Sequence, residues 1–130
     1  MTEKMKILVP SKNIAATVEF SQESPVTVRK IQESLPITGR VNMWGEEIYF
    51  DINVASKLEV NARAEVEIGE VGYWDSGTAF CIFFGRTPAS TSNNKPKAVG
   101  PVNVLGKIID VDPKIFLQVN DGDEIILEKV

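Results

Sequence analysis

The sequence predicts a mainly β fold, either a sandwich or a closed barrel, with about eight strands and one helix. Three observations support this prediction. Short apolar runs recur along the chain, turn-forming residues such as Asp-Ser-Gly and Asp-Gly separate them, and only one segment has helical spacing of its apolar residues. Many short strands separated by turns are typical of sandwiches and barrels. The length of 130 residues fits a single domain, residues 1–130, with a core of its own.

The N-terminal end is expected to form two strands, at residues 5–9 and 14–20, joined by a turn at residues 10–13. The second strand alternates apolar and polar side chains, as Val18 and Glu19 illustrate. We expect the two strands to pair as a hairpin at an edge of the sheet.

The one expected helix covers about residues 25–34. Ser24 is the expected cap, and Pro25 suits the first helical position because its fixed φ is already helical. Pro36 ends the helix, since the residue before a proline avoids the α region. The apolar stripe of the helix consists of Val28, Ile31 and Leu35.

The centre of the fold is expected at residues 69–85, GEVGYWDSGTAFCIFFG. A strand at residues 69–74 leads through a turn at residues 75–77 into an unbroken apolar run at residues 79–84. A strand that is apolar on both faces must be covered on both faces. We expect one face to fill the interior, and the other to line a pocket or to pack under a helix.

The remaining elements lie on either side of this centre. Two strands with a tight passage at Gly45 are expected over residues 39–51, and an irregular loop over residues 52–62. Residues 86–100, rich in Pro, Ser, Thr, Asn and Lys, predict a long surface loop. The last predicted strands are at residues 101–110, 115–119 and 124–129, with an Asp-Gly hairpin turn at residues 120–123 joining the final two.

Charge and composition argue against several kinds of partner. The net charge is −4 and the pI is about 4.9, whereas phosphate contacts need basic patches, so we expect no nucleic-acid partner. No apolar run approaches the length of a membrane span, and the first ten residues lack the pattern of a signal peptide. A single cysteine forms no intramolecular disulfide. Together these features predict a cytoplasmic protein without a membrane partner.

The absence of histidine limits the chemistry further. It removes Ser-His-Asp and Cys-His nucleophilic pairs, and one cysteine without histidine does not supply the common zinc ligand sets. Cys81 lies within the apolar strand, so we expect a buried, inert thiol. We expect neither a metal nor a cofactor.

Four sequence blocks stand in order over most of the chain: Trp-Gly-Glu-Glu-Ile-Tyr-Phe at 44–50, Gly-x-x-x-Tyr-Trp at 69–74, Phe-Phe-Gly-x-Thr-Pro at 83–88 and Pro-Val-Asn-Val-x-Gly-Lys-Ile at 101–108. This order resembles the small prokaryotic cyclophilin-like family of uncharacterised proteins. The resemblance implies a closed eight-stranded β-barrel with one α-helix capping an end.

The true cyclophilins, which are peptidyl-prolyl isomerases, are more distantly similar. Their site has an arginine in a Phe-His-Arg motif, but here Leu35-Pro36 occupies the approximate place and Arg40 lies several residues later. Their Gln-Phe-Phe motif is replaced by Phe80-Cys81-Ile82 or, in another alignment, by Ala79-Phe80-Cys81. The resemblance therefore leaves a weak or atypical isomerase as an alternative.

The candidate ligand-binding site is a shallow cleft with aromatic walls and a charged edge. Large aromatic side chains stack on ligands, although they also plug the ends of a barrel. Adjacent Glu46 and Glu47 point to opposite faces of a strand, so one can enter a site while the other faces water; solvated charge is the alternative for each. Arginines beside a cleft bind carboxylates or carbonyls, or form surface salt bridges. The predicted site residues are Trp44, Tyr49, Trp74 and Phe83 in the walls and Arg40, Glu47 and Arg86 at the edge, with no catalytic residue assigned.

The favoured function is therefore the binding of a peptide segment or a small molecule in the aromatic cleft. One alternative is an enzyme, either the atypical isomerase or a hydrolase or lyase that uses Glu47. The other alternative is a structural or oligomerisation module, in which a homodimer would bury the same aromatic side chains.

Overall fold

The computed structural model describes residues 3–91 and 95–130, and in those residues ten strands form one sheet of a mainly β fold. The strands are β1 (Lys4–Val9), β2 (Ile14–Phe20), β3 (Ile37–Arg40), β4 (Asn42–Met43), β5 (Glu47–Asp51), β6 (Arg63–Glu65), β7 (Glu70–Trp74), β8 (Ala79–Phe83), β9 (Lys97–Ile108) and β10 (Glu124–Lys129). The helices of the described residues are α1 (Pro25–Ser34) and the short 3-10 helices η1 (Pro10–Lys12), η2 (Asp75–Gly77) and η3 (Pro113–Gln118).

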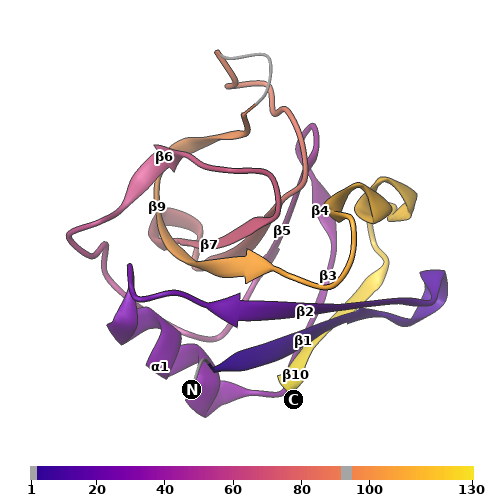
Figure 1. Cartoon of the computed structure of the whole chain (residues 1–130), viewed down its shortest axis with the longest axis horizontal. Helices are drawn as coiled ribbons and strands as arrows, with labels where there is room; N and C mark the ends of the chain where they lie inside the picture. Colours follow the sequence, from indigo (N-terminus) through magenta and orange to yellow (C-terminus); the bar gives the residue numbers. More distant parts are fainter. Residues whose placement is uncertain (1–2, 92–94) are drawn as a thin grey trace.

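The strands pair in the order β3-β10-β1-β2-β9-β7-β8-β5-β4, and β6 pairs with β9 outside this path. Figure 1 shows the sheet curled around the centre of the molecule, with α1 beside β1 and β2. Strands β1 and β2 form the expected hairpin, but they do not lie at an edge. Strand β1 also pairs with β10, and β2 also pairs with β9, because later segments of the chain return to both sides of the hairpin.

The sheet is not closed by hydrogen bonds, so the expected closed eight-stranded barrel is not supported. The two ends of the path, β3 and β4, are consecutive in the chain and are separated only by Val41. Strand β3 pairs with β10 and β4 pairs with β5. Val41 itself bonds to the turn before β10, donating to Asp123 O (2.9 Å) and accepting from Gly122 N (2.8 Å). The chain thus passes from pairing with β10 to pairing with β5 at this residue. The two ends of the sheet are joined by the backbone through Val41, and not by the hydrogen bonds between strands that a closed barrel would have.

Helix α1 has the expected bounds, but its N-terminus is capped from elsewhere in the chain. The Ser24 hydroxyl is buried and has no hydrogen-bond partner. The Glu59 carboxylate instead accepts from the backbone N–H groups of Val26 (3.2 Å) and Thr27 (2.8 Å). A carboxylate forms stronger hydrogen bonds than a hydroxyl and interacts favourably with the helix dipole. Ser24 therefore holds the expected N-cap position, with its carbonyl oxygen accepting from Val28 N (3.0 Å), but its side chain does not cap the helix. The Glu59 carboxylate from the 52–62 loop takes that role.

The last third of the chain differs from the sequence prediction in two places. Residues 115–118 lie in the 3-10 helix η3 instead of a strand, and Val119 is its C-cap. Pro113 supplies a helical φ at the start of η3, and Asp112 Oδ1 accepts from Lys114 N (3.0 Å) there. The turn at residues 120–123 therefore joins η3 to β10, which pairs with β1 and β3.

The polar segment 86–100, expected as one long loop, ends earlier than predicted. Strand β9 begins at Lys97, which pairs with Glu65 of β6. Residues 92–94 of the predicted loop lie outside the described residues.

Strand β8 is buried on both faces and separates two apolar clusters, as the sequence predicted. Phe80 and Ile82 point into the main core, which also holds Val28 and the buried apolar residues of β1, β2 and β10. The intervening side chains point to the opposite face. There Cys81 and Phe83 of β8 pack with residues of other segments in a second cluster, which consists of Val66, Cys81, Phe83, Ala98, Val102 and Val104.

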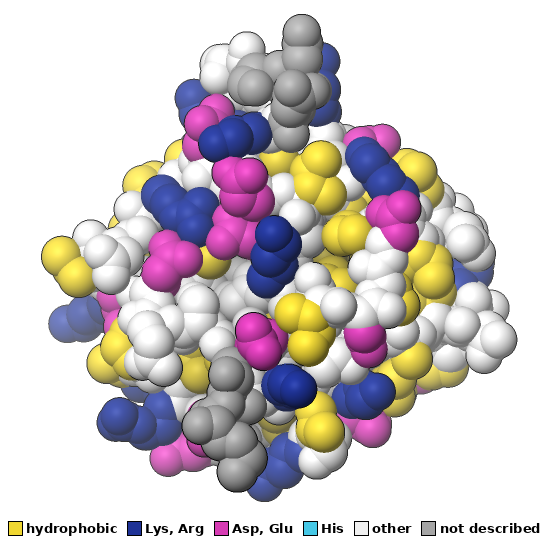
Figure 2. Space-filling model, in the orientation of Figure 1, with side chains coloured by type: hydrophobic (Ala, Val, Ile, Leu, Met, Phe, Trp, Pro, Cys, Tyr) yellow, Lys and Arg dark blue, Asp and Glu magenta, His cyan; other side chains and the backbone are white. Residues whose placement is uncertain are grey.

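The surface carries both signs of charge. On the face shown in Figure 2, basic and acidic side chains are interspersed instead of forming a continuous field of one sign. Within the residues that the structure describes, no helix is long and apolar enough to cross a membrane.

Strand β9 approaches β2 closely at Gly106, which pairs with Phe20 of β2 and with Val71 of β7. A Cβ atom at Gly106 would lie 2.2 Å from the backbone oxygen of Glu19. At Gly100, in the same strand, a Cβ atom would meet nothing within 4 Å. These two glycines give a matched pair for testing the packing of the sheet.

We expect Gly106→Ala to lower the free energy of unfolding by about 3 kcal/mol, because a rigid backbone oxygen leaves no room for the added methyl group. Gly100→Ala is expected to change it by less than about 0.5 kcal/mol, since its methyl group enters open space. Urea denaturation of both variants measures the difference. Equal stabilities would show that β2 and β9 are not in this register.

Candidate functional site

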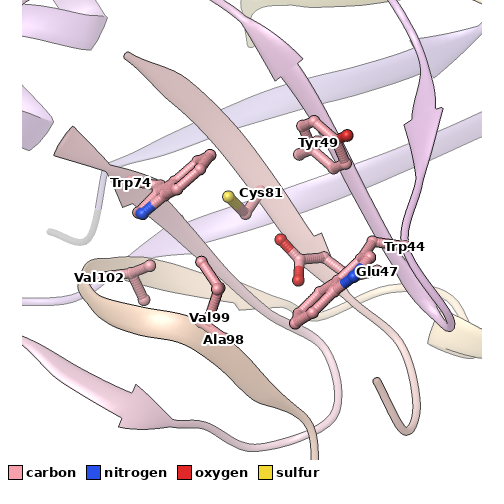
Figure 3. A pocket seen from close by; sticks show the side chains of 8 residues that line it. All are labelled: Trp44, Glu47, Tyr49, Trp74, Cys81, Ala98, Val99 and Val102. Carbon is pink, nitrogen blue, oxygen red and sulfur yellow. The ribbon is translucent and has the colours of Figure 1, made fainter. Parts of the chain in front are cut away.

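A pocket of about 160 Å³ opens on the face of the sheet opposite the main core, between β5, β7, β8 and the first half of β9. Figure 3 shows the Glu47 carboxylate pointing into the space between Trp44 and Cys81, with Tyr49 and Trp74 farther around the same opening. The pocket is lined by Trp44, Glu47, Tyr49, Trp74, Cys81, Ala98, Val99 and Val102.

A tight turn brings Trp44 and Glu47 side by side. Their backbones exchange two hydrogen bonds, Trp44 N to Glu47 O (2.9 Å) and Glu47 N to Trp44 O (3.2 Å). Gly45 in the turn has a φ of +60°, and a Cβ atom there would lie 2.8 Å from Pro88. Residues that face each other across an antiparallel pair project on the same side, so the turn places the indole and the carboxylate in one pocket.

The register of the sheet supplies the other walls. Tyr49 pairs with Cys81, and Cys81 pairs with Gly72 of β7, so all three lie on the pocket side. Trp74 follows Gly72 by two residues and therefore shares its face. Because Gly72 has no side chain, Val102 packs directly over it, with its Cγ2 atom 3.1 Å from the position that a Cβ atom would occupy. The pocket is thus closed by β9 on the side away from the turn.

Glu47 is the one charged group that lines the pocket among the described residues, and it is only 5% exposed. Its Oε1 atom has no hydrogen-bond partner. Burial raises the pKa of this carboxyl to about 7, because charge is poorly solvated there, and a hydrogen bond from the Cys81 thiol lowers it only in part. No lysine or arginine of the described chain lines the pocket to offset the charge.

Cys81 forms part of the pocket floor and is fully buried, as expected. Burial raises the pKa of its thiol well above the usual value, and the negative charge of Glu47 acts in the same direction. Because the thiolate is the reactive form, this environment keeps the thiol unreactive.

The predicted site residues divide into two groups. Four of them line the pocket: Trp44, Glu47, Tyr49 and Trp74. Phe83 lies beneath it, fully buried in the second cluster. Arg40 is on β3, where its guanidinium donates to Gly122 O (3.3 Å), and Arg86 donates to Ser90 O (3.4 Å) in the loop after β8. Neither arginine lines this pocket.

Sequence reasoning missed half of the lining. Cys81 was assigned only to the core, and the residues of β9 were assigned to a loop or to an ordinary strand. The missed lining residues are Cys81, Ala98, Val99 and Val102. The spacing of two between Ala98, Gly100, Val102 and Val104 is the signal that could have extended the strand backward.

The pocket holds a single carboxyl and not a pair. Glu46 points away from Glu47 and forms an ion pair with Lys114 at 2.9 Å, so a second carboxylate does not join the first. In the described part of the chain, no three Asp, Glu or Cys side chains are grouped to hold a metal ion. The pocket offers three aromatic side chains, an apolar floor and one buried carboxyl.

Comparisons with known proteins agree with this fold. Residues 3–128 match the family described as Cyclophilin-like. The chain is similar to a hypothetical protein from Archaeoglobus fulgidus whose structure was determined in solution, with 37% sequence identity and a TM-score of 0.81. That similarity covers 99% of this chain and 95% of the other. No curated protein matches the chain.

The buried carboxyl gives a prediction about stability. The usual pKa of Glu47 in an unfolded chain is 4.5 and the native pKa is about 7, so the native state binds more protons between these values and loses stability as pH rises through them. The full loss, reached above pH 7, is about 3 kcal/mol. A glutamine of the same shape does not ionise. We therefore expect Glu47→Gln to raise the free energy of unfolding by up to about 3 kcal/mol at pH 8 and by little at pH 4.5, as measured by urea denaturation.

Glu46→Gln is the matched control. Its side chain is partly exposed, and the ion pair with Lys114 that it removes is of a kind that contributes at most about 1 kcal/mol. This variant should not reproduce the stabilisation at pH 8. If Glu47→Gln were less stable than the parent chain at pH 8, the carboxyl would not be buried as described.

Proposed function

This chain belongs to the cyclophilin-like family, and we propose that it binds one end group of a peptide or small molecule in the pocket between Trp44, Tyr49 and Trp74. The observation that supports this proposal is the grouping of three half-buried aromatic side chains around one apolar opening. Such side chains provide large contact surfaces and polar N–H or O–H groups at a site open to solvent.

The size of the pocket limits what it holds. Its volume of about 160 Å³ is well below the roughly 300–1,000 Å³ of pockets that enclose a drug-sized ligand. A single side chain or head group fills such a space, while the remainder of the ligand lies across the surface outside. Val99, which is 66% exposed at the rim, is available for contact with that outer part.

Binding is proposed in preference to prolyl isomerisation because of the pocket's charges. An isomerase of the cyclophilin kind would hold an arginine over an apolar pocket, and no arginine of the described chain lines this one. The group that does line it is the Glu47 carboxyl.

A panel of blocked single amino acids, each carrying an acetyl and a methylamide group, tests the proposal because each member offers one side chain to the pocket. We expect a subset of the panel to change the fluorescence of Trp44 and Trp74, since both indoles line the opening. Trp74→Phe should raise the dissociation constants of those members by about threefold to tenfold, as expected from a smaller aromatic surface, with Trp44 as the remaining reporter.

Val60→Ala is the matched control, because Val60 is 97% exposed and lies outside the pocket. It should respond as the parent chain does. Sedimentation of the protein alone separates ligand binding from self-association through the same aromatic side chains. A panel in which no member alters the fluorescence would contradict the proposed function.

A further inference from the structure

We propose that the end group bound in this pocket is an organic cation, of the chemical class of a methylated ammonium, held by the aromatic faces of Trp44, Tyr49 and Trp74 and by the carboxylate of Glu47. This inference rests on the proposed function and adds the charge of the ligand to it. It follows from three features of the pocket: an unpartnered buried carboxylate, the aromatic walls and the absence of a basic lining residue in the described chain.

The carboxylate is the first feature. Glu47 is 95% removed from solvent, and its Oε1 atom forms no hydrogen bond, although buried polar side-chain atoms are usually paired. The Cys81 thiol is a weak donor and is the side chain that bonds the carboxylate. A buried anion of this kind is stabilised by a cation brought within a few ångströms, and the described lining supplies none.

The aromatic walls are the second feature. The face of an indole or phenol ring carries negative potential and attracts a cation within about 6 Å of the ring centre. Figure 3 shows Trp44, Tyr49 and Trp74 arranged around the carboxylate instead of stacked on one another. A methylated ammonium suits this arrangement, because its methyl groups contact rings and valine side chains while its charge faces Glu47.

The same features argue against an anionic ligand. An anionic group would be repelled by the Glu47 carboxylate and would meet no basic lining residue in the described chain. A neutral ligand of the same shape would contact the apolar walls, but it would leave the carboxylate without a charged partner. The charge of the ligand is therefore what the experiment has to isolate.

Three probes of nearly the same shape and of different charge isolate it: choline, 3,3-dimethylbutan-1-ol and 3,3-dimethylbutanoate. We expect choline to bind about tenfold or more tightly than the alcohol, and the carboxylate to bind least, in titrations at pH 8 followed by tryptophan fluorescence. An alcohol that binds as tightly as choline would overturn the cation inference and leave the proposed function standing. No response to any of the three would also overturn it, and the amino-acid panel then decides separately whether the pocket binds ligands.

The pH dependence gives a second readout. The titratable groups that line the pocket are Glu47, Cys81 and Tyr49, and burial raises the pKa of Glu47 to about 7. A cation favours the ionised carboxylate, so the affinity for choline should rise between pH 6 and pH 8, while the affinity for the alcohol should not. Choline affinity that is flat over this range contradicts a contact with Glu47.

Two substitutions test the contact without threatening the fold. Glu47→Gln keeps the shape of the side chain and should reduce choline affinity about tenfold or more at pH 8 without weakening the binding of the alcohol. Val99→Lys places an ammonium group at the exposed rim, where it should compete with choline, whereas Val60→Lys, outside the pocket, should not. Retained choline affinity in Glu47→Gln would overturn the assignment.

Discussion

The burial of β8 on both faces is the constraint on which the rest of this structure depends. Phe80 and Ile82 lie on one face of this strand, and Cys81 and Phe83 lie on the other. Because both faces are apolar, other parts of the chain must shield each of them from water. The curled sheet and α1 cover the first face. The segment before β7 and the first half of β9 cover the second. These segments do not fill the second face completely, so a pocket remains beside the aromatic side chains.

The Glu47 carboxyl in that pocket lowers the stability of the fold when it is ionised. Folding removes Glu47 from water without providing a basic partner in the described chain, and its raised pKa records the free energy that this placement costs. A glutamine of the same shape would not carry the cost of ionisation in this position. Natural chains depart from local rules of stability mainly where a site requires it, so this departure is the main physical reason to connect the pocket with a ligand.

Much of the architecture was predictable from local patterns. The strands at the N-terminal end, the bounds of α1 and the two-faced strand follow from periodicity and from proline and turn residues, and Gly45 marked the turn that carries Trp44 and Glu47. What escaped prediction depends on contacts between distant segments. The sequence around Ser24 does not indicate that Glu59 caps the helix. The sequence around Val41 does not indicate that the chain passes there from pairing with β10 to pairing with β5. The β9 wall was missed because a polar, proline-containing stretch leads directly into a strand at Lys97.

The floor and the rim of the pocket differ in how freely evolution can change them. Cys81 sits on a strand whose reverse side is core, so a larger or polar replacement there would push on the packing of the whole domain. Val99 at the rim touches little besides solvent and the pocket mouth. A substitution at the rim would therefore change the mouth of the pocket with little effect on the packing, whereas a substitution at the floor would disturb both.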